Sequence, residues 1–471
     1  MKLKPYYLGL VLLILLGLTA SSAFGVGSAG TITGGTFPAC VDPATANAST
    51  IKIAGKQVAP GGLVRVPTGT TCLASETTLN LNSYLKTILV SPGPTNITSG
   101  TNLQNAMTAA TPGTLIKVEP GTYDLGTTSL TMKQNVDLEG SGEGLTNITS
   151  QIGSASSPPT AGTVVLASSS EIRFLSVSNN SKSDYNTAVY ASGVNKTARL
   201  SNVTVKCTGG VENNGIFNDN SASPTIQNST ISAAGGSKGS IGISSTNSSS
   251  PTIQNSTIST TGGKNYNFGI YNGASFATIQ NSTISAAEGI KYNYGLYNIN
   301  SSSLIQNSNI SAAGGSFDSI GIYNLANSSP TIQNSTISAA AGNNFNYGIL
   351  NGISSSPTIQ NLTISATGGI YTFGINNSNS SPTIQNSNIS ATGGTYFNYG
   401  IYNDNSATPT IQDSTIFAAR GNNGNYGLYN FGDGNSAKVG ASQLMTAVSG
   451  TGFTCVGVYD ANFAALSPTC T

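Results

Sequence analysis

The chain of 471 residues contains no histidine and no tryptophan, and charged residues make up only 7% of it. Histidine is the commonest metal ligand in proteins, and no closely spaced Cys-x-x-Cys pair replaces it, so no metal or cofactor site is predicted. With a net charge of +1, the chain lacks the excess of basic residues that is typical of nucleic-acid-binding proteins. The composition therefore argues against metal centres and against a nucleic-acid partner.

Long hydrophobic runs are also absent after the first 25 residues. Lys2 and Lys4 precede an apolar run from Leu8 to Leu18, and small residues follow it. This pattern predicts a secretory signal peptide over residues 1–25; an uncleaved membrane anchor fits worse because the run is short. We expect a secreted or cell-surface protein whose mature chain has no transmembrane segment.

Cysteine is scarce, with five residues in the chain. Cys40 and Cys72 flank an N-terminal segment (26–99), and Cys455 and Cys470 close a C-terminal one (438–471). In an oxidising compartment these residues are expected to form two local disulfides that fasten the chain ends. Cys207 is expected to be buried and free.

What the sequence has in abundance is a repeat. The phrase Pro-Thr-Ile-Gln-Asn-Ser-Thr-Ile-Ser and its variants place an isoleucine at steps of 25 to 27 residues, from Ile226 to Ile411. A second phrase, Gly-(Ile/Leu)-Tyr-Asn, follows the same period. Such a period indicates stacked repeats. Three short β-branched runs per repeat, with no helical pattern, predict a parallel β-helix with three strands in each coil of about 26–27 residues.

Alternation along the strands predicts which side chains face inward. It places Phe268, Ile270 and Asn272 inside and Tyr271 outside. In the other two strands of that coil, it places Ile279 and Ile284 inside, with their neighbours outside.

A recurrent asparagine in the Gln-Asn-Ser corner is predicted to adopt the left-handed backbone conformation and to form a structural ladder. The predicted ladder comprises Asn228, Asn255, Asn281, Asn307, Asn334, Asn361 and Asn386.

The segment before the regular repeats carries a family resemblance. Residues 103–110 read as a short amphipathic helix, and Gly113-Thr114-Leu115-Ile116-Lys117-Val118-Glu119-Pro120-Gly121-Thr122-Tyr123 follows it. This resembles the entry to a pectin-lyase-like β-helix. The resemblance implies a right-handed coil over residues 100–437 and an N-terminal capping helix. It is specific for the fold and not for an activity, because enzymes, adhesins and structural proteins share this scaffold.

Catalytic residues are not predicted. Hydrolases of the family need a Gly-His-Gly segment and clustered aspartates, and the lyases need calcium-binding carboxylates beside an Arg or Lys base. Acidic residues in the repeats, such as Asp219, Glu288, Asp318 and Asp404, are scattered. The densest acidic stretch, from Glu119 to Glu143, is interpreted as a solvated edge. A polysaccharide lyase or hydrolase remains an alternative.

The predicted binding face is a row of outward aromatic residues two positions after the repeat glycine. Sugar rings stack on exposed aromatic rings, so this row predicts binding of polysaccharide or cell-surface glycan. Ser244, Leu350 and Asn376 interrupt the row, which favours a purely structural role for it. The candidate residues are Tyr271, Tyr297, Tyr323, Tyr402 and Tyr429.

Two further interpretations stay open. The third strand carries an outward Thr-x-Ser rank, as at Thr257 and Ser259, which resembles the surface of β-helical ice-binding proteins. The other interpretation is a rigid rod that binds no ligand and is either monomeric or assembled end to end. The preferred hypothesis is a non-catalytic surface adhesin or matrix scaffold that binds polysaccharide along a strand face.

Overall fold

The structure is a computed structural model that describes residues 85–155 and 157–470, together with the backbones of five short strands between residues 37 and 81. The chain divides into two compact units, Met1–Lys86 and Thr87–Thr471. The predicted signal peptide lies outside the described residues.

In the first unit, β1 pairs antiparallel with β4 and β5, and β2 pairs antiparallel with β3. The bounds are β1 Phe37–Val41, β2 Lys52–Ile53, β3 Lys56–Gln57, β4 Val64–Arg65 and β5 Thr77–Leu81.

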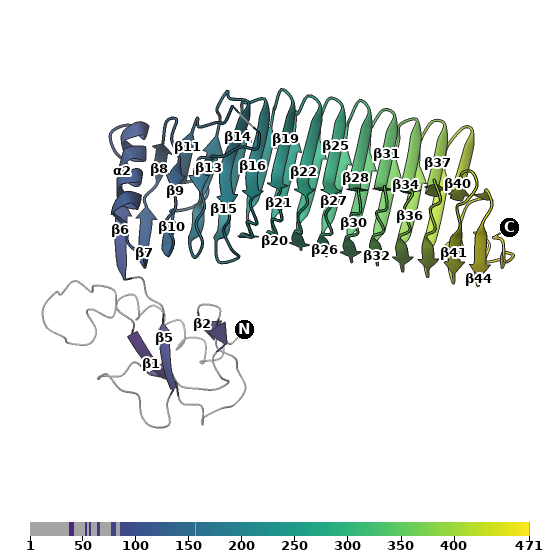
Figure 1. The fold of residues 1–471 in the computed structure, drawn as a ribbon, viewed down its shortest axis with the longest axis horizontal. Coiled ribbons are helices and arrows are strands. Elements are labelled where there is room, and N and C mark those ends of the chain that lie inside the picture. Colours follow the sequence, from purple (N-terminus) through teal and green to yellow (C-terminus); the bar gives the residue numbers. More distant parts are fainter. Residues whose placement is uncertain are drawn as a thin grey trace, which may run out of the picture. The chain divides into compact units, whose positions relative to one another are not determined.

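Near the start of the second unit, after strand β6 (Lys86–Val90), a helix covers the first coils (Figure 1). Helix α2 (Asn96–Ala109) starts seven residues before the segment predicted from the sequence, because Thr95 and Thr98 form a reciprocal capping box at its N-terminus. Leu103, Ala106 and Met107 form its buried face.

The remaining chain winds into a stack of coils (Figure 1). The first coils contain the strands β6 Lys86–Val90, β7 Thr114–Val118, β8 Gly121–Asp124, β10 Val136–Glu139, β11 Thr146–Ser150, β13 Glu171–Asn179 and β15 Arg199–Thr208.

One 13-stranded sheet contains the Gly-(Ile/Leu)-Tyr-Asn strands. Its strands are β9 Leu130–Thr131, β12 Val164–Val165, β14 Tyr185–Ser192, β16 Glu212–Asp219, β19 Gly239–Ser245, β22 Tyr266–Gly273, β25 Tyr292–Ile299, β28 Asp318–Leu325, β31 Phe345–Gly352, β34 Tyr371–Ser378, β37 Phe397–Asp404, β40 Gly424–Asn430 and β43 Val448–Ser449.

The other two strands of each coil come from the Thr-Ile-Gln and Thr-Ile-Ser phrases. The Thr-Ile-Gln series is β17 Thr225–Gln227, β20 Thr252–Gln254, β23 Thr278–Gln280, β26 Leu304–Gln306, β29 Thr331–Gln333, β32 Thr358–Gln360, β35 Thr383–Gln385, β38 Thr410–Gln412, β41 Ala437–Gly440 and β44 Phe453–Val456. The Thr-Ile-Ser series is β18 Thr230–Ala234, β21 Thr257–Thr261, β24 Thr283–Ala287, β27 Asn309–Ala313, β30 Thr336–Ala340, β33 Thr363–Thr367, β36 Asn388–Thr392, β39 Thr415–Ala419 and β42 Gln443–Leu444.

Every strand of a regular coil pairs in parallel with its copies in the neighbouring coils. The repeated isoleucines are in register, as Ile253 with Ile279 and Ile258 with Ile284. The predicted parallel β-helix with three strands per coil is confirmed. Parallel pairing continues through β41 to β44, so coiling extends beyond residue 437, where the sequence placed the start of the C-terminal cap.

The interior combines apolar stacks with amide ladders. Isoleucines from all three strands, such as Ile270, Ile279 and Ile284, are completely buried. The asparagine of the Gly-(Ile/Leu)-Tyr-Asn phrase is also completely buried through most of the coils. Its side-chain amide bonds the next copy at 2.8–3.0 Å along Asn272, Asn298, Asn324, Asn351, Asn377, Asn403 and Asn430.

The predicted alternation fails at the repeat glycine. Gly269 faces inward beside Ile270, where a Cβ would lie 2.4 Å from the Ile284 side chain and 2.5 Å from a neighbouring carbonyl oxygen. Two consecutive residues, Gly269 and Ile270, therefore face inward. Each residue before the glycine faces the side opposite to the one that strict alternation predicted. Asn267 is buried and Phe268 points outward, so the prediction that Phe268 lies inside is wrong.

The corner asparagines do adopt the left-handed conformation, with φ between 48° and 56°. They lie exposed at the edge of the coil, and their amides bond one another in the pairs Asn228–Asn255 and Asn334–Asn361. A more continuous outer ladder runs through the neighbouring glutamines, as in Gln280 to Gln306 at 3.0 Å.

The C-terminal end contains the predicted Cys455–Cys470 disulfide, and Cys207 is buried and free. The other predicted pair involves Cys40, of which only the backbone is described, and Cys72, which lies outside the described residues. That pair stays a prediction.

The buried amide ladder can be tested at Asn324, which accepts a hydrogen bond from Asn298 and donates one to Asn351. Asn324→Ala leaves two buried amide groups without a partner and should lower the free energy of unfolding by about 2 kcal/mol. Chemical denaturation monitored by circular dichroism measures this loss. Asn309→Ala, at an exposed position of β27, is the control, and an equal effect of both variants would contradict a structural role of the ladder.

Candidate functional site

The outward surface of the 13-stranded sheet gathers aromatic side chains into three columns that run along the coil axis. Strand pairing sets the columns, because Tyr266, Phe268 and Tyr271 of β22 lie beside Tyr292, Tyr294 and Tyr297 of β25. We call this surface the aromatic face. Its first column contains Tyr266, Tyr292, Phe345, Tyr371 and Phe397; its second Phe268, Tyr294, Tyr347, Phe373, Tyr399 and Tyr426; its third Tyr271, Tyr297, Tyr323, Tyr402 and Tyr429.

The second column is the floor of the aromatic face. Phe373 and Tyr399 are only 6% and 8% exposed, because rings of the flanking columns pack against them. Their ring centroids are 5.1 Å apart, and the planes of the two rings are nearly parallel. The first and third columns stand on either side of this floor and are half-buried. The other rings of the second column are half-buried too, so a ligand can reach rings of all three columns except at Phe373 and Tyr399.

The five tyrosines predicted from the sequence form the third column. Tyr297 lies between Tyr271 and Tyr323, with ring centroids 5.6 Å and 5.1 Å away. Tyr402 and Tyr429 stack at 5.5 Å in later coils. Leu350 and Asn376 separate the two groups.

The sequence reasoning missed the first and second columns. Their signal was present, since an Asn-(Phe/Tyr)-Gly triplet precedes the tyrosine phrase at Phe268, Tyr294, Tyr347 and Tyr399. Recognising it required knowing that the glycine faces inward and reverses the alternation.

Burial raises the pKa of two phenols in the third column well above the ordinary value. It raises the pKa of Tyr297 and of Tyr402 to about 12, with smaller contributions from neighbouring phenols and, for Tyr402, from Asp404. At neutral pH these side chains therefore present an apolar ring and an uncharged hydroxyl group that can donate or accept a hydrogen bond.

Two carboxylates occupy the register of the first column: Glu212 lies two coils before Tyr266, and Asp318 lies within the column. Glu212 accepts hydrogen bonds from Tyr266 and from Lys238. Asp318 lies between Tyr292 and Phe345, and burial raises its pKa to about 6, although a backbone hydrogen bond from Phe345 partly opposes the shift.

These carboxylates are too far apart to act as a glycosidase pair. Four coils separate β16, which carries Glu212, from β28, which carries Asp318, and this is about 19 Å at ~4.8 Å per coil. The two carboxyl groups of a glycosidase lie within about 10 Å of each other. Glu212 and Asp318 therefore do not form this catalytic arrangement.

A second polar cluster lies on the outer side of the first coils. Arg173 contacts Glu139 at 2.7 Å, Glu171 at 3.0 Å and Asp137 at 3.7 Å, and Lys117 contacts Glu139 at 3.2 Å. The sequence analysis interpreted Asp137 and Glu139 as part of a solvated edge, whereas in the structure they surround one guanidinium group together with Glu171. Burial alone would raise the pKa of Glu139, but hydrogen bonds from Arg173 and Lys117 outweigh it and lower the pKa. With Arg199, which lies 4.0 Å from Glu171, the cluster contains three cationic and three acidic side chains, and its Glu139 is ionised and a poor proton donor.

The Thr-x-Ser rank lies where the sequence predicted it, on the outer side of the Thr-Ile-Ser strands. Thr257 and Thr283 are exposed, and the serines that follow them are half-buried. Asn309 and Asn388 occupy the same register and interrupt the rank.

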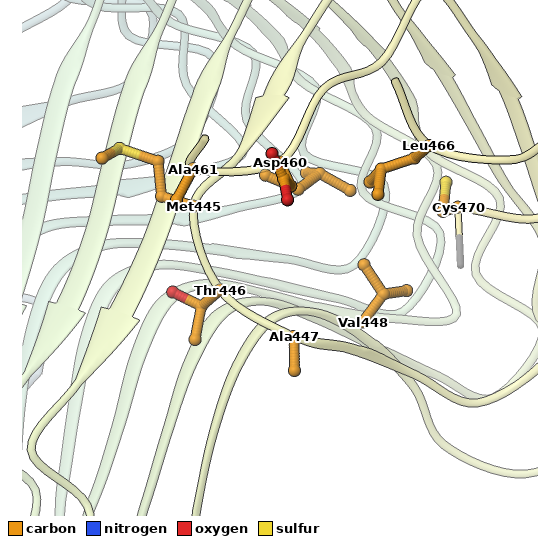
Figure 2. A pocket seen from close by; sticks show the side chains of 9 residues that line it. Met445, Thr446, Ala447, Val448, Asp460, Ala461, Leu466 and Cys470 are labelled. Atoms are coloured by element: carbon orange, nitrogen blue, oxygen red, sulfur yellow. The ribbon is translucent and has the colours of Figure 1, made fainter. Parts of the chain in front are cut away.

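A hollow of about 410 Å³ lies at the C-terminal end of the stack (Figure 2). Val448 extends the inward column of Leu428, and Leu466 and Cys470 line the same hollow. The carboxylate of Asp460 accepts hydrogen bonds from the backbones of Asn462 and Ala464. The hollow is therefore a mainly apolar opening of the core at its last coil.

Comparison with protein families matches residues 268–444 to the model described as right handed beta helix region. The chain is a right-handed parallel β-helix protein. This confirms the handedness and the fold that the sequence resemblance implied. Comparison with curated proteins gives no match.

Solved structures similar to this β-helix protein include the A-module of mannuronan C-5 epimerase AlgE6 from Azotobacter vinelandii, at 16% identity and a TM-score of 0.47, covering 78% of this chain and 96% of that one. A catalytic domain of a GH87 alpha-1,3-glucanase in complex with tetrasaccharides has 14% identity and a TM-score of 0.42, with 86% and 76% covered. A pectate lyase has 16% identity and a TM-score of 0.35, with 81% and 82% covered. At such identities the similarity concerns the fold alone.

Within the described part of this β-helix protein, no three or more Asp, Glu or Cys side chains are grouped so that they could hold a metal ion. The same residues include no helix with the length and apolar character needed to cross a membrane.

The setting of Asp318 predicts a pH dependence of stability. Its folded-state pKa of about 6 exceeds the ordinary value of 3.8. Between these values the folded protein retains a proton that the unfolded protein releases, so the free energy of unfolding falls as pH rises through this window. Asp318→Asn should remove this fall and stabilise the protein above pH 6 by about 1 kcal/mol, after discounting for solvent screening.

Thermal unfolding of both proteins across this pH range provides the measurement. Asp413→Asn changes an exposed corner carboxylate by the same charge and is the matched control. A parallel pH profile for Asp318→Asn and the unmodified protein would show that Asp318 is not desolvated.

Proposed function

We propose that this β-helix protein is an extracellular, non-catalytic protein that binds polysaccharide along the aromatic face and serves as a surface adhesin or matrix scaffold. The observation that carries the proposal is the row of half-buried tyrosines beside a floor of stacked rings. Sugar rings present C–H faces that pack on aromatic rings, while their hydroxyls need polar partners. Tyrosine supplies both, and asparagine and serine dominate the surrounding sequence.

The geometry of the coil suits a linear ligand. The columns repeat at ~4.8 Å along the axis, so equivalent rings recur at a constant spacing over many coils. A polymer lying along the axis would meet the same contact several times, and its weak individual contacts would add. A compact ligand would use only a small part of this surface.

A secreted location is compatible with the Cys455–Cys470 disulfide, because disulfides persist mainly in oxidising compartments. The predicted signal peptide over residues 1–25 supports the same proposal from the sequence. Retention at a cell surface or in a matrix is proposed from the rod-like repeat and from the binding face.

The first test is binding of the purified mature chain, residues 26–471, to an array of microbial and plant glycans. Tyr297→Ala and Tyr402→Ala, combined in one variant, should weaken binding to the recognised glycan by about tenfold or more, because each removes a stacking contact. The residues lie on different parts of the third column, so both halves of the face are probed.

Tyr459→Ala is the matched control, since Tyr459 is 43% exposed in the C-terminal segment and lies outside the three columns. Circular dichroism must show that all variants retain the fold. Glycan binding that survives loss of both Tyr297 and Tyr402 would refute the proposed face, and an array without signal would favour a structural rod.

A further inference from the structure

The charge on the aromatic face is distributed unevenly. Between Lys291 and Arg420 the chain contains no lysine or arginine, and its only acidic residues there are Asp318, Asp404 and Asp413. Asp413 lies at the exposed corner after the Thr-Ile-Gln strand β38, away from the aromatic face. The remaining two carboxylates belong to the 13-stranded sheet, so this half of the aromatic face carries negative charge alone.

Both carboxylates lie beside the rings. Asp318 occupies the first column between Tyr292 and Phe345. Asp404 follows Tyr402 by two positions in the same strand, and both side chains therefore point outward.

The charges of Asp318 and Asp404 both act on Tyr347 in the second column. Burial raises the pKa of the Tyr347 phenol, and the charges of Asp318 and Asp404 raise it further. Three coil steps separate β28 from β37, about 14 Å along the coil axis at ~4.8 Å per step. Asp318 is in register with Phe397, and Asp404 lies seven residues further along β37, about 23 Å across the sheet at ~3.3 Å per residue. The two carboxylates therefore lie at opposite edges of the face, and each can meet the amino groups of a sugar chain that lies along its own edge. Among the described residues, neither carboxylate forms a salt bridge.

We propose that the aromatic face from β28 to β37 selects polysaccharides built from protonated amino sugars over neutral polymers and over polymers of uronic acids. The proposal rests on the carbohydrate-binding function proposed above and names its substrate class. An ammonium group on the sugar is attracted by Asp318 and Asp404 and by the faces of the tyrosine rings. A uronic acid brings a second negative charge to the same surface and is repelled.

The test compares oligomers of glucosamine and of N-acetylglucosamine of equal length by isothermal titration calorimetry. The buffer is held above the Asp318 pKa of about 6, so that this carboxylate is ionised while the glucosamine amines still carry protons. The two oligomers have the same sugar rings, and acetylation removes only the positive charge. The unmodified chain should bind the glucosamine oligomer more tightly, and added salt should reduce the difference. A galacturonic acid oligomer should bind most weakly.

Asp404→Asn should lower the affinity for the glucosamine oligomer by about threefold to tenfold and leave that for the acetylated oligomer unchanged. Asp413→Asn is the matched control, because it removes one charge from another face and installs the residue that the repeat itself carries at this corner. It should change neither affinity.

Equal affinities for both oligomers, or an equal loss in Asp404→Asn and Asp413→Asn, would overturn the selection for amino sugars. If the Tyr297→Ala/Tyr402→Ala variant still lost binding in that case, the proposed carbohydrate-binding face would stand without its charge selection. Failure of every oligomer to bind would overturn the selection for amino sugars, whereas the carbohydrate-binding face itself would be decided by the glycan array. Binding of oligolysine without binding of glucosamine would identify a basic peptide as the partner and overturn this inference.

Discussion

The structure depends on one constraint, which is that each residue of the repeat lies beside its own copy in the next coil. Strands pair in parallel at ~4.8 Å, and the pairing keeps like residues in register, as for Ile253 with Ile279. A residue type is therefore useful only if it packs or bonds with itself. Isoleucine stacks, asparagine bonds asparagine through its amide, and aromatic rings stack on rings. The core, the buried ladder and the aromatic face all follow from this requirement.

The same constraint explains why the chain has so little charge. A charged residue repeated in every coil would place like charges about 5 Å apart, and their repulsion would oppose stacking. Where charges do occupy adjacent coils, they alternate in sign, as in Lys117, Glu139 and Arg173. On the aromatic face, Asp318 stands alone in a column of rings. Single carboxylates of this kind are departures from the repeat, and for that reason we assign them a role in selecting ligands.

The sequence predicted the fold because its period alone requires stacked coils. In two of the three strands, alternation also predicted correctly that the isoleucines face inward and that Thr and Gln face outward. It failed at the third strand. Gly269 approaches the neighbouring coil too closely for any side chain, so it faces inward together with Ile270 and reverses the alternation before it. This local reversal hid the outward position of Phe268 and therefore two of the three aromatic columns. It also hid the inward position of Asn267, while the corner asparagines, predicted as the main ladder, lie exposed. Strand alternation cannot reveal such a change, because it depends on contacts between coils.

The most direct test of the account is hydroxyl-radical footprinting of the unmodified chain with and without the polysaccharide that it binds, read by mass spectrometry. If the aromatic face holds the polymer, oxidation of Tyr297 and Tyr402 should fall on binding. Oxidation of Phe276, which is 52% exposed in a turn beyond the end of β22, should stay unchanged. Protection spread evenly over the surface, or confined to residues outside the three columns, would contradict the claim that stacked rings along the coil form the binding surface.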